Sequence, residues 1–336
     1  MTRLRSAFIG NETPLTMALC RWLADRTNLR LIIWTSPVPW PRRLHSACLR
    51  VGRRILAHRR RKGLWRTLDE FAYYGSYLVF LRAREERRIR PLTVALEGLC
   101  RSSIEGTPQV RSTDLRDPEL WKLLSELGSD AIFATCTNVH FPREVLDAPH
   151  RGAFLWHEGI TPEYRGVYPT FWALYREDYA RIGYTLLKMN EKLDAGPVFV
   201  QGPVVGADYE RDWHCYLSAK SIVDSLPHVD RFIRDLEAGR HQPLERPATD
   251  GYYSYPTATA LVRLALRRRL RRARQVLPSR ITKRFVRWMQ IGTLTAGGCG
   301  RLTPHRATSS TENAEPVPAK AEGESGGDAL GMPRDR

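Results

Sequence analysis

The hydrophobic pattern of the first forty residues predicts a strand, a helix and a second strand. Residues 6–10 form a short apolar run that ends in glycine, residues 15–24 carry apolar side chains at helical spacing, and residues 29–35 are apolar and rich in β-branched side chains. This order is typical of a parallel α/β unit. The glycine-rich fingerprint of dinucleotide sites does not follow the first strand, which argues against a dinucleotide cofactor.

The same alternation resumes after residue 107. Strands are expected at residues 108–112, 130–136, 152–157, 183–189 and 198–205, and helices at residues 117–127, 168–175 and 217–236. Strands that alternate with helices favour a sheet whose strands run mostly in parallel. The predicted fold class is therefore α/β, with a Rossmann-like, mostly parallel sheet.

Two Arg-rich segments and a polar tail interrupt or extend this pattern. Residues 41–105 are predicted to be a basic helical insertion, with an apolar stripe that includes Leu64, Leu68, Phe71 and Tyr74. Residues 211–300 are predicted to be a helical C-terminal region, in which helix 262–289 is broken at Pro278. Residues 301–336 hold almost no large apolar side chains, so we expect a disordered tail. Residues 1–40 and 106–210 then form the α/β domain.

The positive charge of the chain is concentrated in these accessory segments. The 336 residues carry 53 Lys and Arg against 36 Asp and Glu, a net charge of +17. Residues 42–66 hold 10 of these bases and residues 263–287 hold 11, and neither window contains an acid. The charge therefore points to an anionic membrane surface or polyanion beside the α/β domain. The alternative is a solvated helix face whose opposite face is buried.

Neither a membrane span nor a metal site is expected. No stretch reaches the roughly eighteen apolar residues that a spanning helix needs, and the first residues do not have the pattern of a signal peptide. The six cysteines form no C-x-x-C pair, which favours reduced thiols over zinc ligands. The expected location is the cytoplasm, with peripheral contact to the inner face of the membrane left open.

Candidate chemistry is concentrated in residues 155–166 and 193–197. His157 is expected at the carboxyl end of a parallel strand, where open α/β sheets bind their ligands. Asp194 lies in a turn between two strands and could orient an imidazole or relay a proton while an amine attacks. A hydrogen-bonded core histidine and a turn-capping Asp are the structural alternatives. Residues 252–256, an aromatic cluster, could close over a substrate or pack against the sheet.

In order and spacing, these residues resemble the folate-dependent formyltransferases. The family pattern is matched by His157, Pro162 with Tyr164-Arg165-Gly166, Pro169 with Trp172-Ala173, Gly183-Tyr184-Thr185 and Asp194-Ala195-Gly196. The resemblance is specific over residues 130–202 and extends to the opening strand-helix-strand, whereas residues 41–105 and those after 210 lie outside it. It implies a sheet of formyltransferase type and transfer of a formyl group from 10-formyltetrahydrofolate to the amine of a small acceptor, such as an amino sugar or another biosynthetic intermediate.

The resemblance also implies roles for individual residues and no metal. His157 stabilises the oxyanion and Asp194 manages proton transfer. The folate pocket is lined by Cys136, Asn138, Asn190 and Leu193, and the acceptor is bound by Tyr164, Arg165 and Gly166.

The sequence departs from the family pattern at two positions. Leu155 replaces the family's catalytic asparagine and cannot donate a hydrogen bond. Losing one oxyanion donor costs about a hundred- to a thousandfold in rate, unless Asn138 or a backbone amide takes its place. Gly159 replaces a serine, which would widen the cleft.

Two other functions remain open. One is a formyl hydrolase that uses the same cleft. The other is a fold that has lost catalysis, as Leu155 suggests, and serves as a scaffold at an anionic membrane or polymer. Family members that act on initiator tRNA use an appended β-rich domain, whereas the C-terminal third here is predicted to be helical, which argues against tRNA as the substrate.

Overall fold

The computed structural model describes residues 3–35, 63–112, 114–135, 137, 139–246 and 251–276. The predictions for residues 41–62, for the helix beyond residue 276 with its break at Pro278, and for the tail at 301–336 lie outside these described residues.

A seven-stranded sheet forms the centre of the molecule, in the order β3-β2-β1-β4-β5-β7-β8. Strands β1 to β5 pair in parallel, and β7 pairs antiparallel with both β5 and β8. The predicted α/β class with a mostly parallel sheet is therefore confirmed. The strands are β1 (Arg5–Gly10), β2 (Asn28–Trp34), β3 (Gln109–Arg111), β4 (Ala131–Thr135), β5 (Gly152–His157), β7 (Gly183–Lys188) and β8 (Val198–Pro203).

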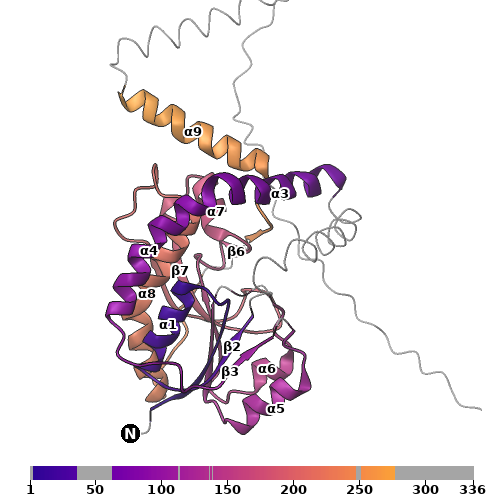
Figure 1. Ribbon diagram of the computed structural model, residues 1–336, viewed down its shortest axis with the longest axis vertical. Helices are drawn as coiled ribbons and strands as arrows, with labels where there is room; N and C mark the ends of the chain where they lie inside the picture. Colours follow the sequence, from indigo (N-terminus) through magenta and orange to yellow (C-terminus); the bar gives the residue numbers. More distant parts are fainter. Residues whose placement is uncertain are drawn as a thin grey trace, which may run out of the picture.

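Helices cover both faces of this sheet (Figure 1). One face is covered by α1 (Pro14–Ala24), α4 (Arg82–Gly98) and α8 (His214–Glu237), and the other by α5 (Pro118–Glu126) and α6 (Arg143–Asp147). The strands are buried on both sides because side chains alternate between the faces: Phe133 joins the core under α1, α4 and α8, whereas Ile132 joins the core under α5 and α6.

Helix α4 lies within the segment that was predicted to be an insertion, yet it packs against α1 and α8. Its Leu96 side chain is buried in the core of that face, and Ile89 and Leu92 pack against the same core. Its burial therefore makes α4 part of the helical layer over the sheet.

Helix α3 (Leu64–Ser76), the π-helical turn η1 (Tyr77–Leu81) and α4 follow one another without a break. The predicted apolar stripe of α3 is only partly covered: Tyr74 packs against the neighbouring core, whereas Leu64 and Leu68 are exposed. The buried residues of the helix are Thr67, Glu70 and Tyr73. Tyr73 decides this orientation, since its ring packs among the aromatic side chains of the α7 region.

The remaining described elements contribute to a third core beside the sheet. They are the two-stranded sheet β6 (Arg165–Gly166) with β9 (Tyr252–Tyr253), α7 (Pro169–Tyr175), the 3-10 turn η2 (Tyr179–Arg181) and α9 (Ala258–Val276). Helix α9 lies against α3 at the end of the molecule away from the N-terminus (Figure 1). Among the described helices, none is long and apolar enough to cross a bilayer.

Candidate active site

Strand β5 ends at His157, which the structure places at the carboxyl edge of the sheet as predicted. The side chain is only 6% exposed, and its Nε2 atom lies 3.1 Å from the backbone oxygen of Tyr164. Because a carbonyl oxygen can only accept, Nε2 carries a hydrogen in this arrangement. The contact fixes the plane of the imidazole, and it is made by the loop that turns back after the strand.

Three side chains from neighbouring elements hold this loop by its backbone. The hydroxyl of Thr170 donates to the oxygen of Glu158 at 2.8 Å, and the hydroxyl of Thr185 donates to the oxygen of Gly159 at 2.6 Å. The amide of Gln201 donates to the oxygen of Thr161 at 2.8 Å and to the Thr185 hydroxyl at 3.0 Å. The loop after His157 is thus anchored to α7, β7 and β8.

Sequence reasoning missed that Thr185 and Gln201 hold the loop after His157. The Gly-x-Thr motif identified Thr185 as part of the pattern without saying what its hydroxyl does. The only sequence signal for Gln201 is a polar residue inside an otherwise apolar strand.

Gly159 does not widen the cleft, so that expectation is wrong. A Cβ atom at this position would lie 2.6 Å from the Cβ of Pro169 and 3.0 Å from the Nε2 of His157. Pro169 already fills the space, and glycine is what lets the first turn of α7 approach the loop this closely.

The turn that holds Asp194 also contacts the loop after His157. The carboxylate is 7% exposed, and its Oδ2 atom accepts a hydrogen bond from the backbone N–H of Gly166 at 2.9 Å. The residue has a φ of 50°, a left-handed conformation that Asp tolerates better than most side chains. A Cβ atom at Gly196 would lie 1.7 Å from the backbone oxygen of Lys188, so this turn packs directly on the end of β7.

His157 and Asp194 therefore converge on one short segment, residues 164–166. The ring of Tyr164 stacks on Tyr253 with centroids 5.1 Å apart, and its hydroxyl donates to Asp178 at 2.9 Å. Arg165 and Gly166 form β6, which pairs in parallel with β9. Arg165 is buried within this arrangement. The prediction that Tyr164, Arg165 and Gly166 bind an acceptor stays a prediction.

Tyr252 of β9 joins the site from outside the motif region. A Cβ atom at Gly166 would lie 3.1 Å from the Cε2 atom of Tyr252, so the ring covers Gly166. Burial raises the pKa of Tyr252, and the negative charge of Asp194 raises it further. Its neighbour Tyr253 is buried and stacks on Trp172. In the aromatic cluster at residues 252–256, Tyr253 therefore packs against α7 and Tyr252 borders the site.

Leu155 lies two residues before His157 in β5, on the same face of the sheet. It is partly buried and packs, as do Val139 and Met189, against the core on the α5 and α6 face. An apolar environment suits leucine here. Two predicted site residues, Cys136 and Asn138, lie outside the described part of the chain, so the proposed substitution of Asn138 for the missing amide stays a prediction.

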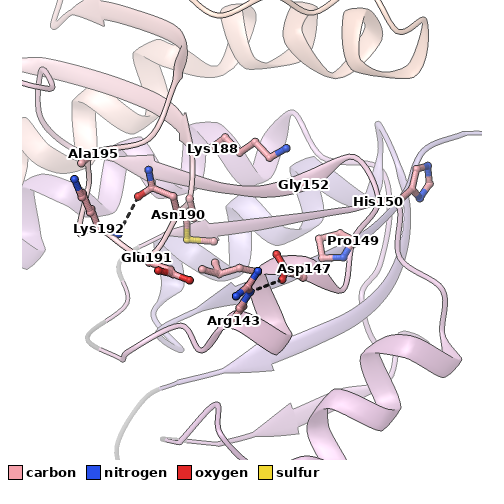
Figure 2. A pocket seen from close by; sticks show the side chains of 12 residues that line it. Arg143, Asp147, Pro149, His150, Gly152, Lys188, Asn190, Glu191, Lys192 and Ala195 are labelled. Atoms are coloured by element: carbon pink, nitrogen blue, oxygen red, sulfur yellow. Dashed lines mark hydrogen bonds and ion pairs between the residues drawn. The ribbon is translucent and has the colours of Figure 1, made fainter. Parts of the chain in front are cut away.

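A cavity of about 730 Å³ adjoins the Asp194 turn. It extends from Ala195, the residue after Asp194, to His150 at the opposite end (Figure 2). Of the predicted folate-binding residues, Asn190 lines the cavity, and its side chain accepts a hydrogen bond from the backbone of Lys192 at 3.0 Å. Leu193 is exposed on the same turn. Three basic side chains, Arg143, Lys188 and Lys192, line the cavity together with Asp147 and Glu191.

Among the described residues, no group of three or more His, Cys, Asp or Glu side chains could hold a metal ion.

Comparisons with known proteins match this region. Residues 83–209 match the sequence model of a family described as formyl transferase. The methionyl-tRNA formyltransferase of Sorangium cellulosum is 32% identical over 108 residues, 32% of this chain and 34% of that protein. That of Geobacillus sp. is 27% identical over 175 residues, 51% of each chain. The chain thus spans about a third to a half of the length of these curated relatives. A solved sugar N-formyltransferase from a Shewanella species has a TM-score of 0.46 and 12% identity over 78% of this chain and 86% of its own.

The family match begins inside α4 and includes β4, β5, β7 and β8 with both His157 and Asp194. Residues 83–105 were expected to lie outside the resemblance, and this is wrong, because α4 packs over the sheet like the other covering helices. The domain limits themselves stay a prediction. Taken with the order of the motifs, the match identifies residues 83–209 of this chain as a formyl transferase domain.

Proposed function

We propose that this protein transfers a formyl group from 10-formyltetrahydrofolate to the amine of a small acceptor. The observation that carries the proposal is the convergence of two buried, chemically active side chains on residues 164–166. His157 contacts the oxygen of Tyr164, and Asp194 accepts from the N–H of Gly166. A base and a hydrogen-bond donor held on one segment can serve an amine that attacks a carbonyl carbon.

In the proposed reaction the acceptor nitrogen forms a bond to the formyl carbon, and the bond from that carbon to N10 of the folate breaks. A protonated His157 would keep its bond to Tyr164 and offer its second ring N–H to the oxyanion. Asp194 would receive the proton that the amine loses, and a proton would return to N10 as tetrahydrofolate leaves. The bond from Gly166 holds the Asp194 carboxylate in place during both transfers.

We further propose that the cavity beside Asp194 binds the folate. Its volume of about 730 Å³ is within the usual range for small-molecule pockets. The basic side chains of Arg143, Lys188 and Lys192 suit the carboxylates at one end of a folate. Asn190 and Leu193 lie on the turn that borders this space.

For the acceptor, we propose a small amine, such as an amino sugar, rather than a tRNA. The curated relatives are named for methionyl-tRNA, but they match over a third to a half of their length. Beyond the family match, the described residues form α8, the short strand β9 and α9. Of these elements, β9 pairs with Arg165 and Gly166, which we propose bind the acceptor.

The test measures release of tetrahydrofolate by the purified full-length chain with a panel of amines. Asp194→Asn keeps an oxygen that can accept from Gly166 but removes the base, so turnover is expected to fall by about a hundred- to ten-thousandfold. His157→Ala is expected to cause a loss of similar size. His228→Ala is the matched control, because His228 bonds the hydroxyl of Tyr184 at 2.9 Å and is not part of the proposed site.

The same assay separates the other candidate functions. Turnover that does not need an amine would favour a formyl hydrolase. A chain that neither binds folate nor turns over with any amine would contradict the transferase proposal and favour the scaffold that Leu155 suggested.

A further inference from the structure

The exposed residues of α3 and η1 include several large apolar side chains and one base, Arg66, which pairs with Glu70. Trp65 is 83% exposed, Val79 72% and Phe80 76%, which is unusual for side chains this large. The two acids of this segment are engaged elsewhere: Glu70 is buried, and Asp69 accepts a hydrogen bond from the backbone of Thr259 at 2.9 Å. Solvent therefore meets apolar side chains along the exposed side of the helix.

Helix α9 has a matching arrangement. Val262, Leu266 and Leu270 recur every four residues and are each more than half exposed. They lie on the side opposite the buried residues Leu261, Leu264 and Arg268, since the helical repeat places these two sets about half a turn apart.

Arginines flank this exposed stripe on both sides. At 100° per residue, Arg269 falls on one edge of the stripe and Arg263 on the other. Both are exposed, and neither has an ion-pair partner among the described residues. In contrast, Arg271 is paired with Glu177 and Glu210, and Arg267 donates to the oxygen of Tyr175. The stripe is thus bordered by cations that the fold does not use.

These two surfaces belong to neighbouring helices. Helix α3 packs against α9 at one end of the molecule (Figure 1). The inner side of α3 contacts the site region, because Tyr73 meets Tyr168 with ring centroids 6.0 Å apart and Tyr74 meets Tyr255 at 5.7 Å. Residues 42–62, which precede α3 in the sequence, contribute nine further Lys and Arg and no acid.

We propose that α3, η1 and α9 dock the protein on the surface of an anionic lipid bilayer. The docking residues are Trp65, Leu68, Val79, Phe80, Val262, Leu266 and Leu270, with Arg263 and Arg269 beside them. The apolar side chains enter the boundary between headgroups and acyl chains, and the arginines bind lipid phosphates. A polyanion in water would satisfy the arginines but would leave the seven apolar side chains exposed, so the bilayer is the partner that accounts for both features.

The test is flotation of the full-length protein with lipid vesicles. Vesicles that contain phosphatidylglycerol are expected to bind the chain, and vesicles of phosphatidylcholine alone are expected to bind much less. Binding should weaken as salt rises from about 0.1 M to about 1 M, because the Debye length falls from about 10 Å to about 3 Å.

Two variants separate the apolar from the ionic contribution. The triple change Val262→Ser, Leu266→Ser and Leu270→Ser keeps every charge and is expected to lower vesicle binding by about tenfold or more, since each lost apolar side chain removes insertion energy. Arg263→Gln with Arg269→Gln is expected to weaken binding to anionic vesicles with little effect on the residual binding to neutral ones. Leu99→Ser with Val205→Ser is the matched control, because both residues are exposed and lie outside α3, η1 and α9.

Two outcomes would overturn the proposal. The first is that the triple serine variant binds vesicles as well as the unchanged chain does, or that heparin binds both proteins equally and more tightly than vesicles do. In either case the surface serves a soluble polyanion. If the chain is a dimer that the triple serine variant converts to monomer, the apolar face is covered by a second copy instead. Circular dichroism of each variant verifies that folding is retained.

Discussion

At the scale of single residues, Leu155 separates this chain most clearly from the family pattern. It occupies the same face of β5 as His157 but brings no hydrogen-bonding atom to the site. Sequence comparison alone identified the replacement. The structure adds that the side chain is partly buried, so a new polar group there has to find a partner in the site or lose stability.

This leads to a prediction for Leu155→Asn. The amide restores an oxyanion donor beside His157, so turnover is expected to rise by up to about a hundredfold. Leu155→Ala is the control, because it removes the leucine without adding a donor. The kcat of tetrahydrofolate release with a saturating amine is the measurement. Equal rates for the two variants would mean that the amide does not reach the oxyanion.

At the scale of elements, the turns and loops of the site depend on close backbone approaches. The Asp194 turn lies so near the end of β7 that Gly196 has no room for a Cβ atom, which would sit 1.7 Å from the oxygen of Lys188. The strand end and the turn are further joined by the N–H of Lys188, which donates to the oxygen of Pro197 at 2.8 Å. The position of the Asp194 carboxylate, which we propose acts as the base, is thus set by β7.

We therefore expect Gly196→Ala to displace the turn. The change should lower the free energy of unfolding by about 1–3 kcal/mol, and it should also reduce turnover, because Asp194 moves with the turn. Gly98→Ala is the matched control, since a Cβ atom at the end of α4 meets nothing within 4 Å. Urea unfolding followed by circular dichroism measures both variants. A stable Gly196→Ala protein with unchanged kcat would contradict the proposed coupling.

At the scale of the whole molecule, His214 lies where α3, α8 and α9 meet. Its Nε2 atom is 2.9 Å from the hydroxyl of Tyr73. Burial lowers the pKa of His214 to about 3, and the positive charge of Arg268 contributes in the same direction. In the unfolded chain the same imidazole titrates near 6.5. Protons therefore bind the unfolded state first as the pH falls, and stability that is present above about pH 6.5 is lost toward pH 3.

The predicted loss attributable to His214 is about 2 kcal/mol between about pH 7.5 and about pH 5. His214→Gln, which cannot titrate, should show a correspondingly shallower pH dependence of the free energy of unfolding. Burial raises the pKa of Glu85 on α4, and its protonation acts in the opposite direction. The difference between variant and unchanged chain isolates His214 from this effect. Parallel pH profiles for the two proteins would contradict the prediction.

Much of the fold and part of the site follow from the sequence alone. The periods of apolar residues predict the strands and helices of the α/β domain, because a repeat near 3.6 residues indicates a helix and a repeat of two indicates a strand. The positions of His157 after a strand and Asp194 in a turn are equally local, so motif order was sufficient to find them. The charge of the windows 42–66 and 263–287 is likewise a property of sequence.

Other features were decided only by tertiary structure. The sequence pattern predicted an apolar stripe on α3 without saying what it contacts, and the structure buries Tyr73 instead while Leu64 and Leu68 are exposed. Likewise, nothing local predicts that Gln201 holds the loop after His157, or that β9 brings Tyr252 to Asp194. These contacts join residues far apart in the chain. The face of an element that is buried depends on what packs against it, and that partner is chosen only when the whole chain folds.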